Sequence, residues 1–285
     1  MFGWFTKKKQ EVIVSAFNEP IALKDMVVAV LSDVGMVRTN NEDAAIILVP
    51  DDEAVLHKRG YLLILADGMG GHNSGEVASR IAVEVFGREY YNNDLNIIKS
   101  LKHALEKANK AIYESSLTDA ALRGMGTTIT GIVIKNKEIY LTQVGDSRAY
   151  LFKGDVPSQL SKDQTLVQYK IDRGEIRPEE AGTHPERNVL TNALGTKPFI
   201  DGEIKLLQFD WNDDVSILLC SDGLYEYVKE KEMAELLKAE INIEKVAMEM
   251  VENAKNRGGH DNITVIIASR KGSINKRPPR DTEPG

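Results

Sequence analysis

Residues 61–72 read Tyr-Leu-Leu-Ile-Leu-Ala-Asp-Gly-Met-Gly-Gly-His, an apolar run that ends in an aspartate and three glycines. The run at 61–66 has the length of a strand and is nearly continuous in large aliphatic side chains, which is typical of a strand covered on both faces. Three glycines in four residues let the backbone turn sharply and approach a ligand closely. We therefore expect this stretch to be central both to the fold and to a candidate site.

Similar strand-like runs occur on both sides of this stretch. They lie at 26–31, 44–49, 127–134, 138–144, 148–152, 215–220 and 263–268. Helical periodicity appears in two pairs of segments, 74–85 with 97–112 and two stretches within 236–251 that are split near Asn242. This order is not a regular strand–helix alternation, so it disfavours a Rossmann or barrel fold and favours packed sheets with helix pairs outside.

The composition divides the chain into a body and two ends. Residues 1–25 form an N-terminal lead-in, of which residues 1–10 are expected to be flexible, and the proline-rich, basic segment 270–285 is predicted to be a disordered tail. The body, residues 26–269, is predicted to be one domain. Within it, residues 161–203 hold three prolines and many charges, which predicts an irregular flap inserted between strands.

Charge and cysteine content exclude several classes of protein. The formal net charge is −7 and both ends are basic, so the body is more acidic than the whole chain, which disfavours nucleic acid as a partner. The single cysteine, Cys220, excludes an internal disulfide and a zinc site built from several cysteines, and it fits a cytoplasmic location. No apolar stretch approaches the ~20 residues of a membrane span, and residues 1–10 lack the apolar core of a secretory signal. We expect no stable membrane insertion.

Acidic residues recur where a predicted strand meets a turn. Glu42 and Asp43 precede the strand at 44–49, Asp67 follows the strand at 61–66, Asp222 follows 215–220, and Asp261 precedes 263–268. If these strand ends converge, the like charges need protons or cations, and Mg²⁺ or Mn²⁺ suits oxygen ligands. Each acidic residue by itself also fits a plain turn or a helix cap. Spacing alone therefore favours metal-assisted hydrolysis or phosphoryl chemistry without deciding between them.

Seven segments, in order, together resemble the type-2C (PPM) family of metal-dependent Ser/Thr protein phosphatases in its bacterial form. The resemblance covers about residues 26–269, and it implies an α+β fold, a four-layer α-β-β-α sandwich in which two antiparallel sheets are flanked by helix pairs. The implied metal centre lies at one end, between the sheets, with the flap beside it. The seven segments are Ser-Asp-Val-Gly-Met-Val-Arg-Thr-Asn-Asn-Glu-Asp (32–43), Ala-Asp-Gly-Met-Gly-Gly-His (66–72), Gly-Met-Gly-Thr-Thr (124–128), Val-Gly-Asp-Ser-Arg (144–148), Asn-Val-Leu-Thr-Asn-Ala-Leu-Gly (188–195), Ser-Asp-Gly-Leu (221–224) and Gly-His-Asp-Asn-Ile-Thr-Val (259–265).

The resemblance implies a ligand set for two Mn²⁺ or Mg²⁺ ions. Asp67 would bridge the two ions, Gly68 would give its carbonyl oxygen to one of them, and Asp222 and Asp261 would bind the other. Two further acidic residues would hold metal-bound waters or complete a coordination shell, namely Glu42 and Asp43.

Two more residues carry implied roles next to the metal ions. Asp146 matches the carboxylate associated with a third, weaker ion, although the sequence Gly-Asp-Ser-Arg also fits a hairpin turn. Arg38 would bind the substrate phosphate, because a guanidinium fork matches phosphate oxygens.

The implied reaction is hydrolysis of phosphoserine and phosphothreonine in proteins by a metal-bridging water, which would reverse a bacterial Ser/Thr kinase. We therefore expect phosphoprotein substrates, a cognate Ser/Thr protein kinase and a monomeric enzyme. Many eukaryotic relatives have a histidine general acid where this chain has Met69, a methionine that bacterial members share. His72 is a candidate for that role, and so are a metal-bound water and solvent; His72 also fits a plain turn histidine.

Two other classes of function stay open at this stage. The chain could be a non-catalytic binding module that keeps the fold, although the presence of all four aspartates of the implied ligand set disfavours this. It could also be another metal hydrolase, one that acts on small phosphates.

Overall fold

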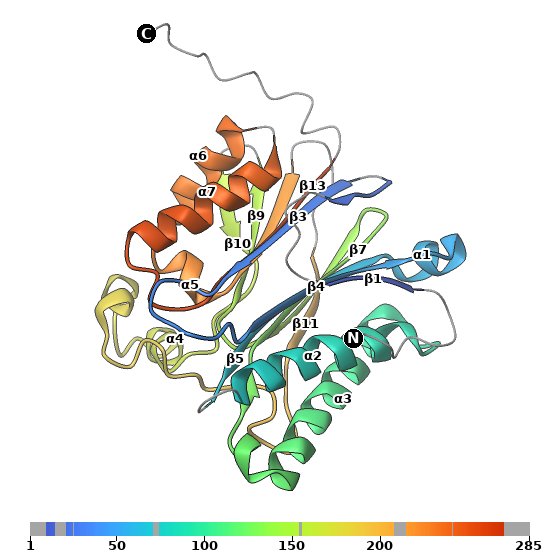
Figure 1. The fold of residues 1–285 in the computed structure, drawn as a ribbon, viewed down its shortest axis with the longest axis horizontal. Helices are drawn as coiled ribbons and strands as arrows, with labels where there is room; N and C mark the ends of the chain where they lie inside the picture. Colours follow the sequence, from blue (N-terminus) through green and yellow to red (C-terminus); the bar gives the residue numbers. More distant parts are fainter. Residues whose placement is uncertain are drawn as a thin grey trace, which may run out of the picture.

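The computed structural model describes residues 10–14, 21–24, 26–70, 74–153, 156–207, 215–240 and 242–270. These residues form two antiparallel sheets that pack face to face, with helices on both outer sides (Figure 1). This arrangement confirms the predicted α-β-β-α sandwich.

The first sheet contains the apolar run at 61–66 within its strand β5. Its strand order is β1-β4-β5-β7-β8-β11, and the short β6 pairs with the end of β5. The strands are β1 (Gln10–Val14), β4 (Asp43–Pro50), β5 (Tyr61–Met69), β6 (Gly126–Thr127), β7 (Ile129–Lys135), β8 (Glu138–Val144) and β11 (Glu203–Leu207).

The side chains of β5 explain why its sequence is apolar without a break. Leu62 and Ile64 point to the helical side of the sheet, whereas Leu63 and Leu65 point to the core between the sheets. All four are fully buried. Because successive side chains in a strand point to opposite faces, a strand covered on both sides needs aliphatic residues at every position.

The second sheet has the strand order β10-β9-β12-β13-β3-β2. Its outer face packs against a helix pair, and its inner face shares one apolar core with the first sheet. The strands are β2 (Ile21–Ala22), β3 (Met26–Asp33), β9 (Arg148–Lys153), β10 (Val156–Gln159), β12 (Val215–Cys220) and β13 (Ile263–Arg270).

Helix pairs cover the two outer faces (Figure 1). In α3, the predicted apolar stripe is confirmed, because Ile97, Leu101, Leu105, Ala108 and Ile112 are all buried against the first sheet and α2. The first sheet is covered by α2 (Ser74–Tyr91) and α3 (Ile97–Thr118), and the second by α6 (Glu230–Ala239) and α7 (Ile243–Asn256); the shorter helices are α1 (Glu53–Arg59), α4 (Leu166–Asp172), α5 (Asp222–Tyr225), η1 (Ala120–Leu122) and η2 (Pro178–Thr183). Within the described ranges, no helix has the length and apolarity that crossing a bilayer requires.

Three elements differ from the sequence-based expectation. Residues 10–14 lie in the predicted N-terminal lead-in, where no strand was expected, but they form β1 and pair with β4. The helix α1 begins after Asp52, whose side chain accepts a hydrogen bond from the amide of Ala54 at 2.8 Å, in a segment without a predicted element. The strand β11 closes the edge of the first sheet beside β8, in a place where no strand was expected and just where the predicted flap ends.

Along the chain, residues 161–203 connect β10 of the second sheet to β11 of the first, and they contain α4 and η2. Figure 1 places α4 near α5, and an ion pair of 3.6 Å between Arg187 and Glu226 joins this segment to the residue after α5. At its start, Asp163 accepts two hydrogen bonds from Arg148 Nε, at 3.0 and 3.1 Å, and one from Arg148 Nη2 at 2.7 Å. The segment is therefore attached to the same end of the sandwich as α5.

Candidate metal centre

The two acidic residues of the first sheet are neighbours across a strand pair. Asp43 opens β4 and faces Asp67 of β5 as its register partner. Directly opposite residues in an antiparallel pair have their Cβ atoms about 5 Å apart on the same face, so the two carboxyl groups are held side by side. The Asp67 backbone is fixed from the other flank, because its amide donates to Thr128 Oγ1 and its carbonyl accepts from the Thr128 amide, both at 2.9 Å.

The second sheet supplies two more carboxylates at the same end of the sandwich. Asp222 is the first residue of α5, two residues after the end of β12, and Asp261 lies two residues before β13. A direct bond joins the sheets here, because Ser221 Oγ donates to Asp43 Oδ2 at 2.8 Å. The structure thus brings the four strand-end aspartates together, as predicted.

Asn262 organises the loop that leads into β4, a role for which the sequence gives no signal beyond its place in the seventh segment. Its Oδ1 accepts from the Glu42 amide at 2.8 Å, and its Nδ2 donates to the carbonyls of Val34 and Asn40 at 3.0 and 2.9 Å. The side chain is 4% exposed. One buried amide group therefore holds Glu42 and the loop before it in place, next to Asp261.

Gly68 illustrates why a glycine follows Asp67. A Cβ atom on Gly68 would lie 2.2 Å from the Gly75 carbonyl oxygen and 2.5 Å from the Glu42 carbonyl oxygen. Both neighbours are backbone atoms, which cannot move aside cheaply. Any larger residue would therefore push α2 and the Glu42 loop away from the cluster.

Burial and mutual repulsion make the charged forms of these carboxyl groups costly. Burial, followed by the charges of neighbouring aspartates, raises the pKa of Asp67 and of Asp222 well above the usual range. Burial raises the pKa of Asp43 to about 6 despite opposing hydrogen bonds, and burial with the charge of Asp163 raises the pKa of Asp146 to about 7. Asp146 is thus part of the cluster, because its charge also acts on Asp67 and Asp222.

Three buried oxygens of this cluster lack a hydrogen-bond partner among the described residues, namely Glu42 Oε1, Asp43 Oδ1 and Asp222 Oδ1. An unpartnered buried carboxylate oxygen is costly unless a proton or a cation satisfies it. Hard divalent cations prefer such oxygens, so the residues present fit Mn²⁺ or Mg²⁺. Among the described residues, no group of three or more His, Cys, Asp or Glu side chains is arranged so that it could hold a metal ion as it stands. These carboxylates, named here the acidic pocket, form a cluster with free ligand oxygens.

The remaining predicted residues have different outcomes. Arg38 lies beside the pocket and donates from Nη2 to Asp261 Oδ2 at 2.7 Å, with 48% of its side chain exposed. His72 lies outside the described residues, so its predicted role stays a prediction. Cys220 is fully buried in the core between the second sheet and its helices, as a packing residue.

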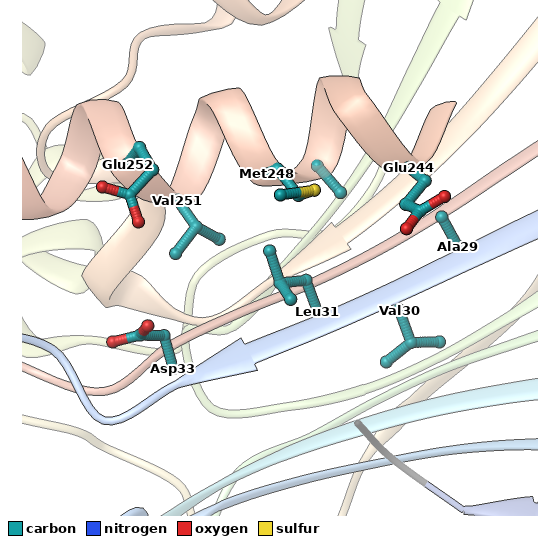
Figure 2. Close-up of a pocket in the computed structure, with 9 residues that line it drawn as sticks. Ala29, Val30, Leu31, Asp33, Glu244, Met248, Val251 and Glu252 are labelled. Carbon is teal, nitrogen blue, oxygen red and sulfur yellow. The ribbon is translucent and has the colours of Figure 1, made fainter. Parts of the chain in front are cut away.

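A separate cavity of about 340 Å³ lies between α7 and β3 (Figure 2). Figure 2 shows Met248 and Leu31 facing each other across it, with Asp33 and Glu252 at one end. Lys255 Nζ lies 3.0 Å from a carboxylate oxygen of each of these two acids. None of the predicted site residues lines this cavity, so it is distinct from the acidic pocket.

Clustered buried carboxylates and an arginine at one end of a two-sheet sandwich fit the site of a metal-dependent hydrolase. Comparison with known proteins narrows this class. Residues 39–258 match the family described as Protein phosphatase 2C. The chain belongs to the protein phosphatase 2C family, as its sequence resemblance predicts.

Individual relatives agree with this assignment. The chain is 34% identical over 244 residues to the serine/threonine phosphatase stp of Listeria innocua, which covers 84% of this chain and 94% of the relative. The crystal structure of the Mycobacterium tuberculosis serine/threonine phosphatase PstP/Ppp superimposes with a TM-score of 0.75 and 34% identity, over 86% of this chain and 98% of that one. The solved catalytic domain of PstP in complex with two manganese ions has a TM-score of 0.73 and 33% identity, over 86% and 98% of the two chains.

Proposed function

We propose that this chain is a protein-serine/threonine phosphatase, which hydrolyses phosphoserine and phosphothreonine in proteins with two Mn²⁺ or Mg²⁺ ions. The observation that carries the proposal is the group of three buried, unpartnered carboxylate oxygens in one pocket, with Arg38 at its edge. Membership of the protein phosphatase 2C family and the names of the phosphatase relatives support it. The manganese-bound PstP domain supports the choice of cofactor.

The proposed ligand set is the one that the resemblance to the family implies. Asp67 would bridge the two ions, with the Gly68 carbonyl on one of them and Asp222 and Asp261 on the other. Glu42 and Asp43 would complete the shell, directly or through water, and Asp146 would hold a third ion. Bound divalent cations supply Lewis acidity and lower the pKa of a coordinated water.

The chain's own residues would prepare the substrate for attack. Arg38 would bind the phosphoryl oxygens and orient the phosphorus toward the pocket, because a guanidinium group donates a fork of N–H groups to phosphate. Its present bond to Asp261 positions it at the rim. His72 remains a candidate for protonating the leaving alkoxide.

The proposal also includes a cognate Ser/Thr kinase, a monomeric enzyme and a cytoplasmic location.

Removal of metal tests the proposed reaction directly. Purified protein is expected to release phosphate from a phosphothreonine peptide when Mn²⁺ is present, to lose this activity on chelation and to regain it when Mn²⁺ is added back. The physical reason is that the pocket's carboxylates repel both one another and the phosphate unless cations are bound. A colorimetric phosphate assay measures the release. Activity on phosphodiesters alone, or release that chelation does not affect, would contradict the proposal.

Substitution of the rim arginine tests phosphate binding. We expect Arg38→Ala to lower kcat/KM for the phosphothreonine peptide by about 10- to 100-fold, because charge-assisted hydrogen bonds contribute about 1.5–3 kcal/mol. Arg38→Lys should recover part of the loss, since it keeps the charge without the fork. The matched control is Arg88→Ala, which removes an arginine of similar exposure that pairs with Glu89 on α2. An equal loss in both alanine variants would argue against a phosphate-binding role.

A further inference from the structure

Two consecutive apolar residues precede Arg38 on the loop beside the carboxylate cluster. Met36 is 64% exposed and Val37 is 60% exposed. Single exposed apolar side chains are common on protein surfaces, but adjacent ones beside a site are candidates for contact with a ligand. Neither side chain has a part in the metal and phosphate chemistry proposed above.

The loop that presents this pair is fixed from several directions. The Gly35 amide donates to Asp33 Oδ1 at 2.8 Å, and the Met36 amide donates to the Gly259 carbonyl at 2.7 Å. Gly35 has a φ of +80°, and a Cβ atom there would lie 2.2 Å from the Asp261 carbonyl oxygen. The loop therefore needs glycine and rests directly on the backbone of a proposed metal ligand. A surface fixed in advance loses little conformational freedom when it binds a partner.

The pair is adjacent to the group that would hold the phosphate. Val37 precedes Arg38, whose guanidinium lies 2.7 Å from Asp261. The Met36 side chain also borders Gly259, because a Cβ atom there would be 3.0 Å from Met36 Cγ. Consecutive Cα atoms are about 3.8 Å apart, and an extended peptide advances about 3.3 Å per residue. The residues within two positions of a phosphorylated residue held by Arg38 can therefore reach this pair.

We propose that Met36 and Val37 form a specificity surface that contacts an aliphatic side chain within two residues of the phosphorylated serine or threonine. This inference rests on the proposed phosphatase function and names a substrate preference of the same site. The enzyme then favours phosphopeptides with leucine, isoleucine or valine beside the phosphoresidue over peptides with serine at that place. The preference arises from apolar surface that both partners remove from water.

Matched phosphothreonine peptides test the preference. One set carries leucine at a single position from −2 to +2, and the reference peptide carries serine at all four positions. For at least one leucine position, wild-type enzyme with Mn²⁺ is expected to show kcat/KM about tenfold above the reference, as partial burial of one leucine side chain implies. In the Met36→Ser/Val37→Ser variant this ratio should fall to about one. Thermal unfolding of the variant checks that it is folded.

Two control variants and one small substrate separate the possible outcomes. Val156→Ser and Met248→Ser remove side chains of similar exposure (65% and 51%) from β10 and α7, and both should keep the wild-type ratio. A ratio of one in the wild type, a ratio unchanged in the double variant, or the same fall in the controls overturns the inference. Phosphothreonine with acetyl and amide caps has no flanking residue, so its hydrolysis reports the phosphatase function alone. Hydrolysis of this substrate without a leucine preference would overturn the inference and leave the proposed function in place, whereas no hydrolysis of any substrate would overturn both.

Discussion

Asp67→Asn is expected to lower kcat on a phosphothreonine peptide by about 10²- to 10³-fold, the size of effect typical of losing one preorganised electrostatic group. The substitution keeps the shape of the side chain and removes its charge. It also leaves the backbone bonds between Asp67 and Thr128 intact, so the strand end should keep its position. The loss would therefore report the carboxylate and not a disturbed fold.

Metal affinity gives this prediction a second readout. Calorimetric titration of Mn²⁺ should show a weaker or missing binding event in Asp67→Asn, because an amide oxygen is a poorer ligand for a hard cation than a carboxylate. Glu106→Gln, which removes an exposed carboxylate from α3, is the control and should titrate like the wild type. Near-normal kcat together with unchanged metal binding in Asp67→Asn would refute the bridging role.

The second prediction with a large effect concerns a substitution that should lower activity and raise thermal stability. We expect Asp222→Asn to abolish most phosphatase activity and yet to raise the melting temperature of the metal-free protein at pH 8. Burial and neighbouring carboxylates raise the pKa of Asp222 well above its usual value, so its charge opposes folding when no cation is bound. For a protein of this size each 1 kcal/mol shifts the melting temperature by about 2–4 °C.

The pH dependence follows from the same pKa shifts. A carboxyl group with a raised pKa in the folded state contributes stability that is complete below its unfolded pKa, about 3.9, and is lost as the pH rises through its folded pKa. With the pKa of Asp43 at about 6 and that of Asp146 at about 7, the metal-free wild type should melt at a lower temperature at pH 8 than at pH 5. Added Mn²⁺ should raise the melting temperature at pH 8 in the wild type and much less in Asp222→Asn.

Differential scanning fluorimetry of chelated protein at the two pH values measures both effects. Glu106→Gln again serves as the control, because its carboxylate is exposed on α3 and lies outside the pocket. If the metal-free wild type were more stable at pH 8 than at pH 5, burial and repulsion of the charged carboxylates would not destabilise the folded protein as we expect. A destabilised Asp222→Asn would lead to the same conclusion.

The architecture could be predicted from the sequence where local patterns and packing agree. The run at 61–66 is short and is followed by glycines, which favours a doubly covered strand over a buried helix. The stripe from Ile97 to Ile112 has the period of a helix with one buried face. By contrast, β11 reads Glu-Ile-Lys-Leu-Leu in a segment rich in charges and turns. It becomes a strand because the edge of β8 is available to it, and that is a tertiary property.

The candidate site could likewise be predicted from the sequence only in part. Carboxylates at strand ends could be predicted because chemistry and position coincide in the sequence. The groups that hold them could not be predicted, since their partners are distant along the chain: Asn262 bonds to Glu42, and Ser221 bonds to Asp43. A single sequence carries no record of which polar side chain will meet which backbone amide across 178 or 220 residues.

The strand β1 has a practical consequence for anyone who shortens this chain. A protein that starts at residue 26, the domain boundary predicted from the sequence, would lack β1 and leave the outer edge of β4 without its partner. That edge belongs to the aliphatic run 44–49, and an open aliphatic edge is a template on which strands of other molecules add. Truncation there would therefore expose this edge to strands of other molecules, so residues 10–14 protect the protein against aggregation.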